Sequence, residues 1–125
     1  MVFPDMADVL VMRGDETVGV VPMLVGDGRS VIEAYSSGEM LQEVMRRHLD
    51  FVVIPDNQET VEGVELVAVL RRMTSGAIVM VGEGRSDQVK SALLLGADTY
   101  LTIPVHPRDL RGRLFGSREG RNLST

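Results

Sequence analysis

Three acidic residues, Asp15, Asp56 and Glu83, each follow closely after an apolar run of the sequence. Asp56 raises the sharpest question, because the stretch DFVVIPDNQE places a proline between the apolar run and the carboxylate. A side chain just past the carboxyl end of a buried strand is well placed to meet a ligand. The three carboxylates predict either a cation site around Arg13, or an acidic loop rim that Arg13 neutralises. We expect the second arrangement, with Asp56 as a loop residue.

The segment GEGRS at residues 82–86 offers a second kind of chemistry. Backbone N–H groups at Gly82 and Gly84 and the side chains of Arg85 and Ser86 are suited to holding an anion. The segment lacks the third glycine of the dinucleotide fingerprint, and it follows the fourth apolar run instead of the first. We expect a turn in which Ser86 caps the next helix, with a weak anion site as the alternative.

Composition excludes several other classes of site. The chain has 125 residues, no cysteine and two histidines without metal-ligand spacing, so no metal site and no cofactor is predicted. The net charge of −5 argues against direct nucleic-acid binding by this domain. No apolar segment is long enough to span a membrane and no signal peptide is evident, which predicts a cytoplasmic protein.

The elements that must position these residues follow from the pattern of apolar runs. Several of five short runs are continuously apolar, as in parallel strands that are buried on both faces. They are Val9–Met12, Val31–Tyr35, Phe51–Ile54, Ala77–Val81 and Thr99–Thr102.

Helical patterns follow each of these runs. We expect a short or bent helix near Glu16–Leu24, because Pro22 interrupts a longer one. The later helices are predicted to begin at a Ser37 cap, at the start of VEGVELVAVLRRM (residues 61–73), at the Ser86 cap and at Pro107. His106 is expected to be the polar N-cap of the last of these helices, and Gly96 to end the one before it.

Alternating strands and helices predict an α/β fold, a flavodoxin-like (βα)5 three-layer sandwich. Its parallel five-stranded sheet is expected in the order 2-1-3-4-5, with ligands beyond the carboxyl ends of the strands. Residues 1–116 are predicted to form this domain. Residues 117–125 are polar and are predicted to be a linker toward a further, C-terminal output domain.

At this point the chain resembles the receiver domain of bacterial two-component response regulators, from about Asp8 to Phe115. The strongest similarity lies in GADTYLTIPVHPRDL, residues 96–110. GRSVIEAYSSGEMLQEV resembles the second strand and helix of the family. DFVVIPDNQETVEGVELVAVLRRM resembles the third, with Gly63 at the turn glycine of the family.

The resemblance implies a site that lacks the groups needed for phosphoryl transfer. Receivers use an acid pair, a phosphoacceptor aspartate, a hydroxyl and a lysine at the strand ends, because metal and lysine must neutralise the transferring phosphoryl group. With Gly63 and Gly96 as the reference points, the resemblance places these five roles at Arg13 and Gly14, Pro55, Val81 and Ile103. The chain is therefore similar to a degenerate receiver, a pseudo-receiver that lacks the phosphoacceptor Asp. No catalytic residue is assigned, and the chain is not predicted to be an enzyme.

The resemblance also implies a surface and a switch. In the family, the fourth helix, fifth strand and fifth helix form the usual dimerisation and output face, and an aromatic residue at the position of Tyr100 swings between two rotamers. Because Val81 offers no hydroxyl partner, we expect Tyr100 simply to pack at the sheet edge. The bond between Ile103 and Pro104 is predicted to be cis. The charged residues offered by the face are Lys90, Asp98, Arg108, Asp109, Arg111 and Arg113.

Three functions remain open from the sequence. The first is a phosphorylation-independent receiver that regulates a signalling protein, in particular a transcriptional regulator, through homodimerisation or a protein partner. The second is a sensor that binds a small ligand or anion in the former phosphorylation pocket. The third is an active receiver that is phosphorylated at the shifted Asp56. DNA contact is expected only through an output domain.

Overall fold

The computed structural model describes residues 9–56 and 62–113, which alternate strands and helices along the chain. The strands are β1 (Val9–Met12), β2 (Val31–Ala34), β3 (Phe51–Pro55), β4 (Ala77–Gly82) and β5 (Thr99–Thr102). The helices are α1 (Val20–Gly26), α2 (Ser37–Arg46), α3 (Glu62–Met73) and α4 (Ser86–Leu95), and residues 107–113 form a further helical segment.

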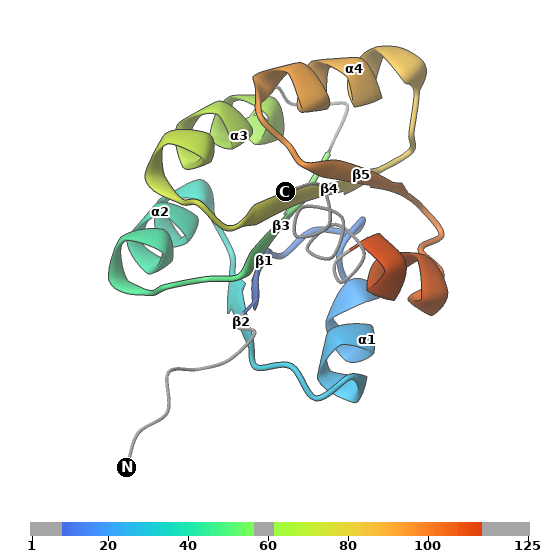
Figure 1. The fold of residues 1–125 in the computed structure, drawn as a ribbon, viewed down its shortest axis with the longest axis horizontal. Coiled ribbons are helices and arrows are strands. Elements are labelled where there is room, and N and C mark those ends of the chain that lie inside the picture. The colour runs from blue at the N-terminus through green and yellow to red at the C-terminus, as the bar shows by residue number, and fades with distance from the viewer. Residues whose placement is uncertain (1–8, 57–61, 114–125) are drawn as a thin grey trace, which may run out of the picture.

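All five strands are parallel and lie in the order β2-β1-β3-β4-β5, which confirms the predicted topology. Helices cover both faces of the sheet, with α2, α3 and α4 on one side and α1 and the 107–113 helix on the other (Figure 1). The register pairs Pro55 with Val81 and Val81 with Leu101. The carboxyl ends of the central strands therefore meet at one edge, where the sequence places its candidate site.

Two apolar cores result from the alternation of side chains along each strand. In β3, Val52 and Ile54 point to the core under α2, α3 and α4, whereas Phe51 and Val53 point to the core under α1 and the 107–113 helix. All four side chains are fully buried. Burial on both faces explains why this strand reads as a continuous apolar run in the sequence.

Several predicted boundaries are wrong by one to four residues. The first helix begins at Val20 instead of near Glu16, because residues 14–19 form a turn before it. Ser36, not Ser37, caps α2, and its hydroxyl accepts a hydrogen bond from the Glu39 N–H at 3.2 Å. Ser86 is the first residue of α4 and does not cap it; Arg85 holds the cap position but makes no side-chain capping hydrogen bond to the helix.

The predictions for Gly96, for the Ile103–Pro104 bond and for His106 are confirmed. The bond between Ile103 and Pro104 is cis, as expected. His106 caps the 107–113 helix, because its Nδ1 accepts a hydrogen bond from the Arg108 N–H at 3.0 Å. Gly96 ends α4 with φ at 123°. The predicted linker at 117–125 lies outside the described residues.

Within residues 9–56 and 62–113, no helix has the length and apolar character that a membrane span requires.

Candidate functional site

The five positions that the sequence assigned to a disabled phosphorylation site lie where the strands end. Arg13 and Gly14 follow β1, Pro55 ends β3, and Val81 lies opposite Pro55 in β4. Ile103 follows β5, and its N–H donates a 2.9 Å hydrogen bond to the carbonyl of Gly82. None of these residues carries a carboxylate, a hydroxyl or an ammonium group.

Pro55 and Gly14 fill the centre of this site by direct packing. A Cβ on Gly14 would lie only 3.0 Å from Cγ of Pro55, so the proline ring occupies the space beside the glycine. Thr17, fully buried, fixes the turn that carries Gly14. Its hydroxyl donates to the Met12 carbonyl at 2.6 Å and accepts from the Gly14 N–H at 3.1 Å. The turn after β1 is thus held by a threonine and packed against a proline.

Arg13 contacts the edge of the sheet formed by β2, and does not neutralise the three candidate carboxylates. Its guanidinium lies 3.6 Å from Glu33 and 5.6 Å from the ring centre of Tyr35, and it donates to the Tyr35 hydroxyl at 3.5 Å. The hydrogen bond with Tyr35, and then the charge of Glu33, raise the pKa of Arg13 above its ordinary value. The expectation of an acidic rim neutralised by Arg13 is therefore wrong.

Asp56 lies just past the end of β3, outside any strand or helix, and it is buried. Only 5% of it is accessible, and its carboxylate accepts a 2.8 Å hydrogen bond from the hydroxyl of Tyr100. Its N–H donates to the carbonyl of Val81 at 2.7 Å, which continues the pairing of β3 with β4. Among the described residues, Asp15, Asp56 and Glu83 form no cluster that could hold a metal ion.

Tyr100 consequently does more than pack at the sheet edge. Burial, and then the hydrogen bond and charge of Asp56, raise the pKa of the Tyr100 hydroxyl well above its ordinary value. The hydroxyl therefore stays protonated and donates to Asp56 at neutral pH. It also accepts a long hydrogen bond, 3.4 Å, from the Gly84 N–H in the loop after β4.

The glycine-rich loop after β4 is shaped by Tyr100 and Thr102. A Cβ on Gly82 would collide with the Tyr100 hydroxyl, and one on Gly84 would lie 2.5 Å from Oγ1 of Thr102. Gly84 also has φ at 81°, which favours glycine. These packing demands account for both glycines without an anion, so the anion site at Gly82, Gly84, Arg85 and Ser86 stays a prediction.

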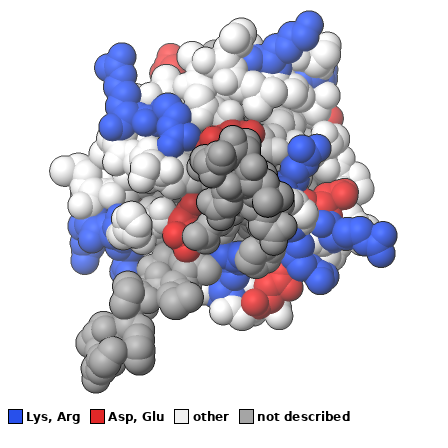
Figure 2. Space-filling model, viewed as in Figure 1, with Lys and Arg blue, Asp and Glu red and all other residues white. Residues whose placement is uncertain are grey.

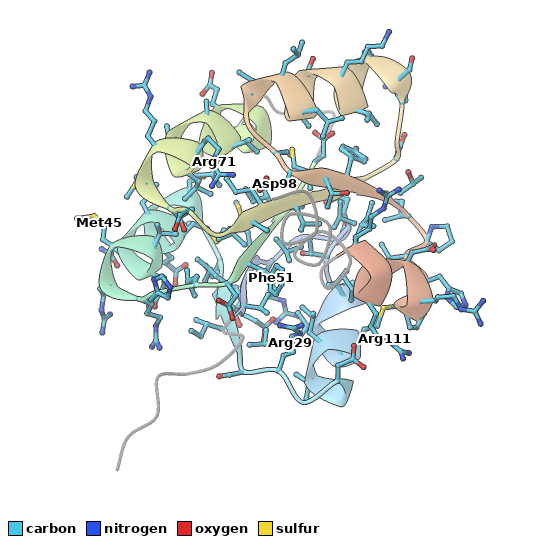
Figure 3. The ribbon with its side chains drawn as sticks, viewed as in Figure 1. Arg29, Met45, Phe51, Arg71, Asp98 and Arg111 are labelled. Atoms are coloured by element: carbon cyan, nitrogen blue, oxygen red, sulfur yellow. The ribbon has the colours of Figure 1, made fainter. Side chains whose placement is uncertain are left out.

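Two of the charged residues assigned to an interaction face have partners within the chain. Asp98 accepts hydrogen bonds from Arg71 Nη1 at 2.9 Å and from the Ile78 N–H at 2.7 Å, so it joins α3, β4 and the start of β5. Figure 3 shows the side chains of Arg71 and Asp98 close to one another. Arg111 lies 3.6 Å from Asp27, beyond the end of α1.

The remaining charged residues of that face are exposed. Lys90 lies on α4, and Arg108, Asp109 and Arg113 lie on the 107–113 helix. A cavity of about 240 Å³ opens between this helix and β5. Tyr100, Leu101, Thr102, Val105, Asp109 and Arg113 line it.

Sequence reasoning missed two structural residues, Thr17 and Arg71. Thr17 stands three residues after Gly14, a spacing at which hydroxyl side chains commonly bond to a turn, so a signal was present. Arg71 gave no signal beyond its place in the last turn of α3, where a basic residue suits the helix dipole. Its contacts with the Thr74 and Gly76 carbonyls, at 2.7 and 2.9 Å, depend on the folded loop after α3.

Comparison with known proteins agrees with the fold and indicates which family of proteins the chain resembles. No protein-family model matches the chain. The aerobic respiration control protein ArcA of Escherichia coli is 34% identical over 103 residues, which cover 79% of this chain and 42% of ArcA. The transcriptional regulatory protein YvrH of Bacillus subtilis is 28% identical over 87 residues, which cover 69% of this chain and 37% of YvrH.

Solved structures of receiver domains share the fold of this chain. A response regulator receiver domain protein from Clostridium thermocellum has a TM-score of 0.79 at 25% identity, and the match covers 96% of this chain and all of that one. The fold and the strand-end site define a flavodoxin-like α/β domain of the CheY-like type. The relatives identify it further as a response-regulator receiver domain, a signalling domain related to transcriptional regulators. The chain spans about two fifths of the length of these curated relatives.

Proposed function

We propose that this chain is a phosphorylation-independent receiver domain, which acts by dimerisation as a regulatory module of a transcriptional regulator. The observation that carries the proposal is the proline that ends β3 and packs against Gly14. A proline has no nucleophilic group, and its ring takes the space in which a carboxylate on residue 14 would lie. Phosphoryl transfer to an aspartate needs both groups, because Mg²⁺ requires hard oxygen ligands beside the nucleophile.

The surroundings of Pro55 support the same conclusion. The side chain of Arg13 is directed to Glu33 and Tyr35 on β2, and Ile103 offers no ammonium group to neutralise a phosphoryl oxygen. Asp56, the nearest carboxylate in sequence, is 5% accessible and engaged by the Tyr100 hydroxyl. The Tyr100 hydroxyl thus occupies one of the two carboxylate oxygens, Oδ2, and burial limits access to the group.

The surface supports an interaction role. Lys90, Arg108, Asp109 and Arg113 are exposed and of mixed sign, and the face of the molecule in Figure 2 shows basic and acidic side chains interspersed. Opposite charges on one face can pair with the same face of a second copy. Across a two-fold axis, an acidic residue of one copy can contact a basic residue of the other, and each such contact occurs twice. A second copy of the chain is therefore the partner that we propose.

Incubation with acetyl phosphate and Mg²⁺, followed by intact-mass and peptide analysis, tests independence from phosphorylation. We expect no mass increase of one phosphoryl group, and the same result for the Asp56→Asn variant. A stoichiometric phosphoryl adduct on Asp56 would overturn the proposal and establish the shifted-site alternative. An active receiver treated in parallel shows that the donor and metal are effective.

Analytical ultracentrifugation over a range of concentrations tests dimerisation. We expect a monomer–dimer equilibrium that weakens in Arg113→Glu and in Asp109→Arg, and that recovers when the two variants are mixed. Arg72→Glu on α3, an exposed charge on the other side of the sheet, is the matched control and is expected to leave the equilibrium unchanged. A concentration-independent monomer would contradict dimerisation, and its stabilisation by a small anion would favour the sensor.

A further inference from the structure

A short hydrogen-bonded bridge crosses the carboxyl ends of three strands, and the proposed function does not account for it. The Tyr100 hydroxyl of β5 passes over β4 to the Asp56 carboxylate, which follows β3, at 2.8 Å. Gly82 of β4 lies beneath this contact, and a Cβ there would lie 2.9 Å from Cβ of Asp56 and collide with the hydroxyl. Only a glycine at this place lets the tyrosine reach the carboxylate.

We infer that Asp56 is a positioning residue that holds Tyr100 in a single, half-buried arrangement, and thereby fixes the end of β5 and the loop after β4 without a phosphoryl group. We name the three residues Asp56, Gly82 and Tyr100 the tyrosine latch. The loop is included because the Gly84 N–H donates to the same hydroxyl at 3.4 Å. Asp56 thus has a role in this fold that requires no phosphorylation.

The closed latch is the favoured state for a simple reason. A buried carboxylate is unfavourable unless it is hydrogen-bonded, and Tyr100 supplies a donor to a residue that is only 5% accessible. The backbone of Asp56 is also fixed, since its N–H donates to Val81 at 2.7 Å. Opening the latch would leave the carboxylate without this bond and would release the Gly84 N–H at the same time.

The latch lies next to the surface on which the proposed function rests. Tyr100 also lines the cavity between β5 and the 107–113 helix, together with Thr102, Asp109 and Arg113. A partner that recognises this cavity with β5 in its latched position would bind less tightly when the latch is open, in proportion to the closed fraction. This last step depends on the proposed function, whereas the latch itself does not.

Tyrosine fluorescence can report on the latch alone. The chain has two tyrosines and no tryptophan, so Tyr35→Phe leaves Tyr100 as the sole emitter. In that background, Asp56→Ala is expected to shift quenching by acrylamide from the protected value toward that of free tyrosine. The matched control is Asp15→Ala, which removes an exposed carboxylate and is expected to leave quenching unchanged. Unchanged quenching in a folded Asp56→Ala protein would overturn the inference.

Hydrogen exchange gives a second measurement should Asp56→Ala fail to fold. In Tyr100→Phe, the Gly84 amide loses its acceptor and is expected to exchange about twofold to tenfold faster, the range for one hydrogen bond. Amides within β1 are expected to keep their rates. Equal Gly84 rates in the parent and Tyr100→Phe would contradict the latch. Ultracentrifugation of the same variants tests dimerisation separately, so a protein that dimerises without a latch, or has a latch without dimerising, is recognised as such.

Discussion

The guanidinium of Arg71 and the carboxylate of Asp98 meet at 2.9 Å, and this contact joins α3 to the start of β5 across 27 positions of the chain. Arg71 also donates to the Thr74, Gly76 and Gly96 carbonyls, at 2.7, 2.9 and 3.3 Å. One side chain therefore connects the end of α3, the loop before β4 and the end of α4.

Asp98→Ala is expected to lower the free energy of unfolding by about 1–3 kcal/mol, because it removes the acceptor of the Ile78 N–H and the carboxylate that pairs with Arg71. Urea unfolding measures the change. Glu65→Ala, which removes an exposed carboxylate on α3, is the control and is expected to change stability by less than about 0.5 kcal/mol. Equal effects of the two substitutions would show that the Arg71 contact adds no stability.

Two glycines are expected to respond to alanine in opposite directions. Gly96 has φ at 123°, and a Cβ there would lie 2.7 Å from Cγ of Arg71, so Gly96→Ala is expected to destabilise by about 1–3 kcal/mol. Gly112 lies in the 107–113 helix, and a Cβ there meets nothing within 4 Å. Gly112→Ala is therefore expected to stabilise by about 0.5–1 kcal/mol. Thermal unfolding of both variants measures the changes, and a loss of stability in Gly112→Ala would contradict this account.

Stability at alkaline pH is expected to depend on Tyr100. Burial, followed by Asp56, raises its pKa in the folded protein, so the folded state keeps a proton that the unfolded state releases above about pH 10. The stabilisation is therefore complete below that pH and is lost as the pH rises further. The difference in unfolding free energy between the parent and Tyr100→Phe is expected to shrink from neutral pH to about pH 11. A difference that stays constant over this range would count against a raised pKa.

Restoring carboxylates at the strand ends is expected to create a metal response. One variant combines the substitutions Arg13→Asp, Gly14→Asp and Pro55→Asp. It carries three carboxylates in place of the arginine, the glycine and the proline. We expect this variant to be destabilised by like charges and to regain stability with Mg²⁺, by about 2.7 kcal/mol at a hundredfold excess over the dissociation constant. The parent is expected to show no shift in melting temperature, and an equal Mg²⁺-dependent shift in the parent would contradict a disabled site.

Much of the site could be predicted from sequence, because strand ends are set by local pattern. Continuous apolar runs such as Phe51–Ile54 indicate strands buried on both faces, and the residue that follows each run must lie at the carboxyl edge. Pro55 and Val81 were located by the resemblance to receiver domains, through Gly63 and Gly96, and β3 and β4 pair them in register. Helix starts were less certain, since Ser36 and Ser37 are both good caps and only the backbone at 36 decides between them.

The sequence by itself determined the sheet, its order and the absence of acidic, hydroxyl and amine groups at the five strand-end positions, because these depend on apolar periodicity and on residue identity. Only the tertiary structure decided which partner each charged or polar side chain finds. Asp56 bonds to Tyr100, 44 positions away, and Arg71 bonds to Asp98, 27 positions away. One backbone step past a strand turns a side chain to the opposite face, so the direction of Asp56 depends on local geometry that no residue pattern encodes. For this reason the sequence predicted only a loop residue at Asp56, whereas the structure shows a buried carboxylate that accepts a hydrogen bond from Tyr100.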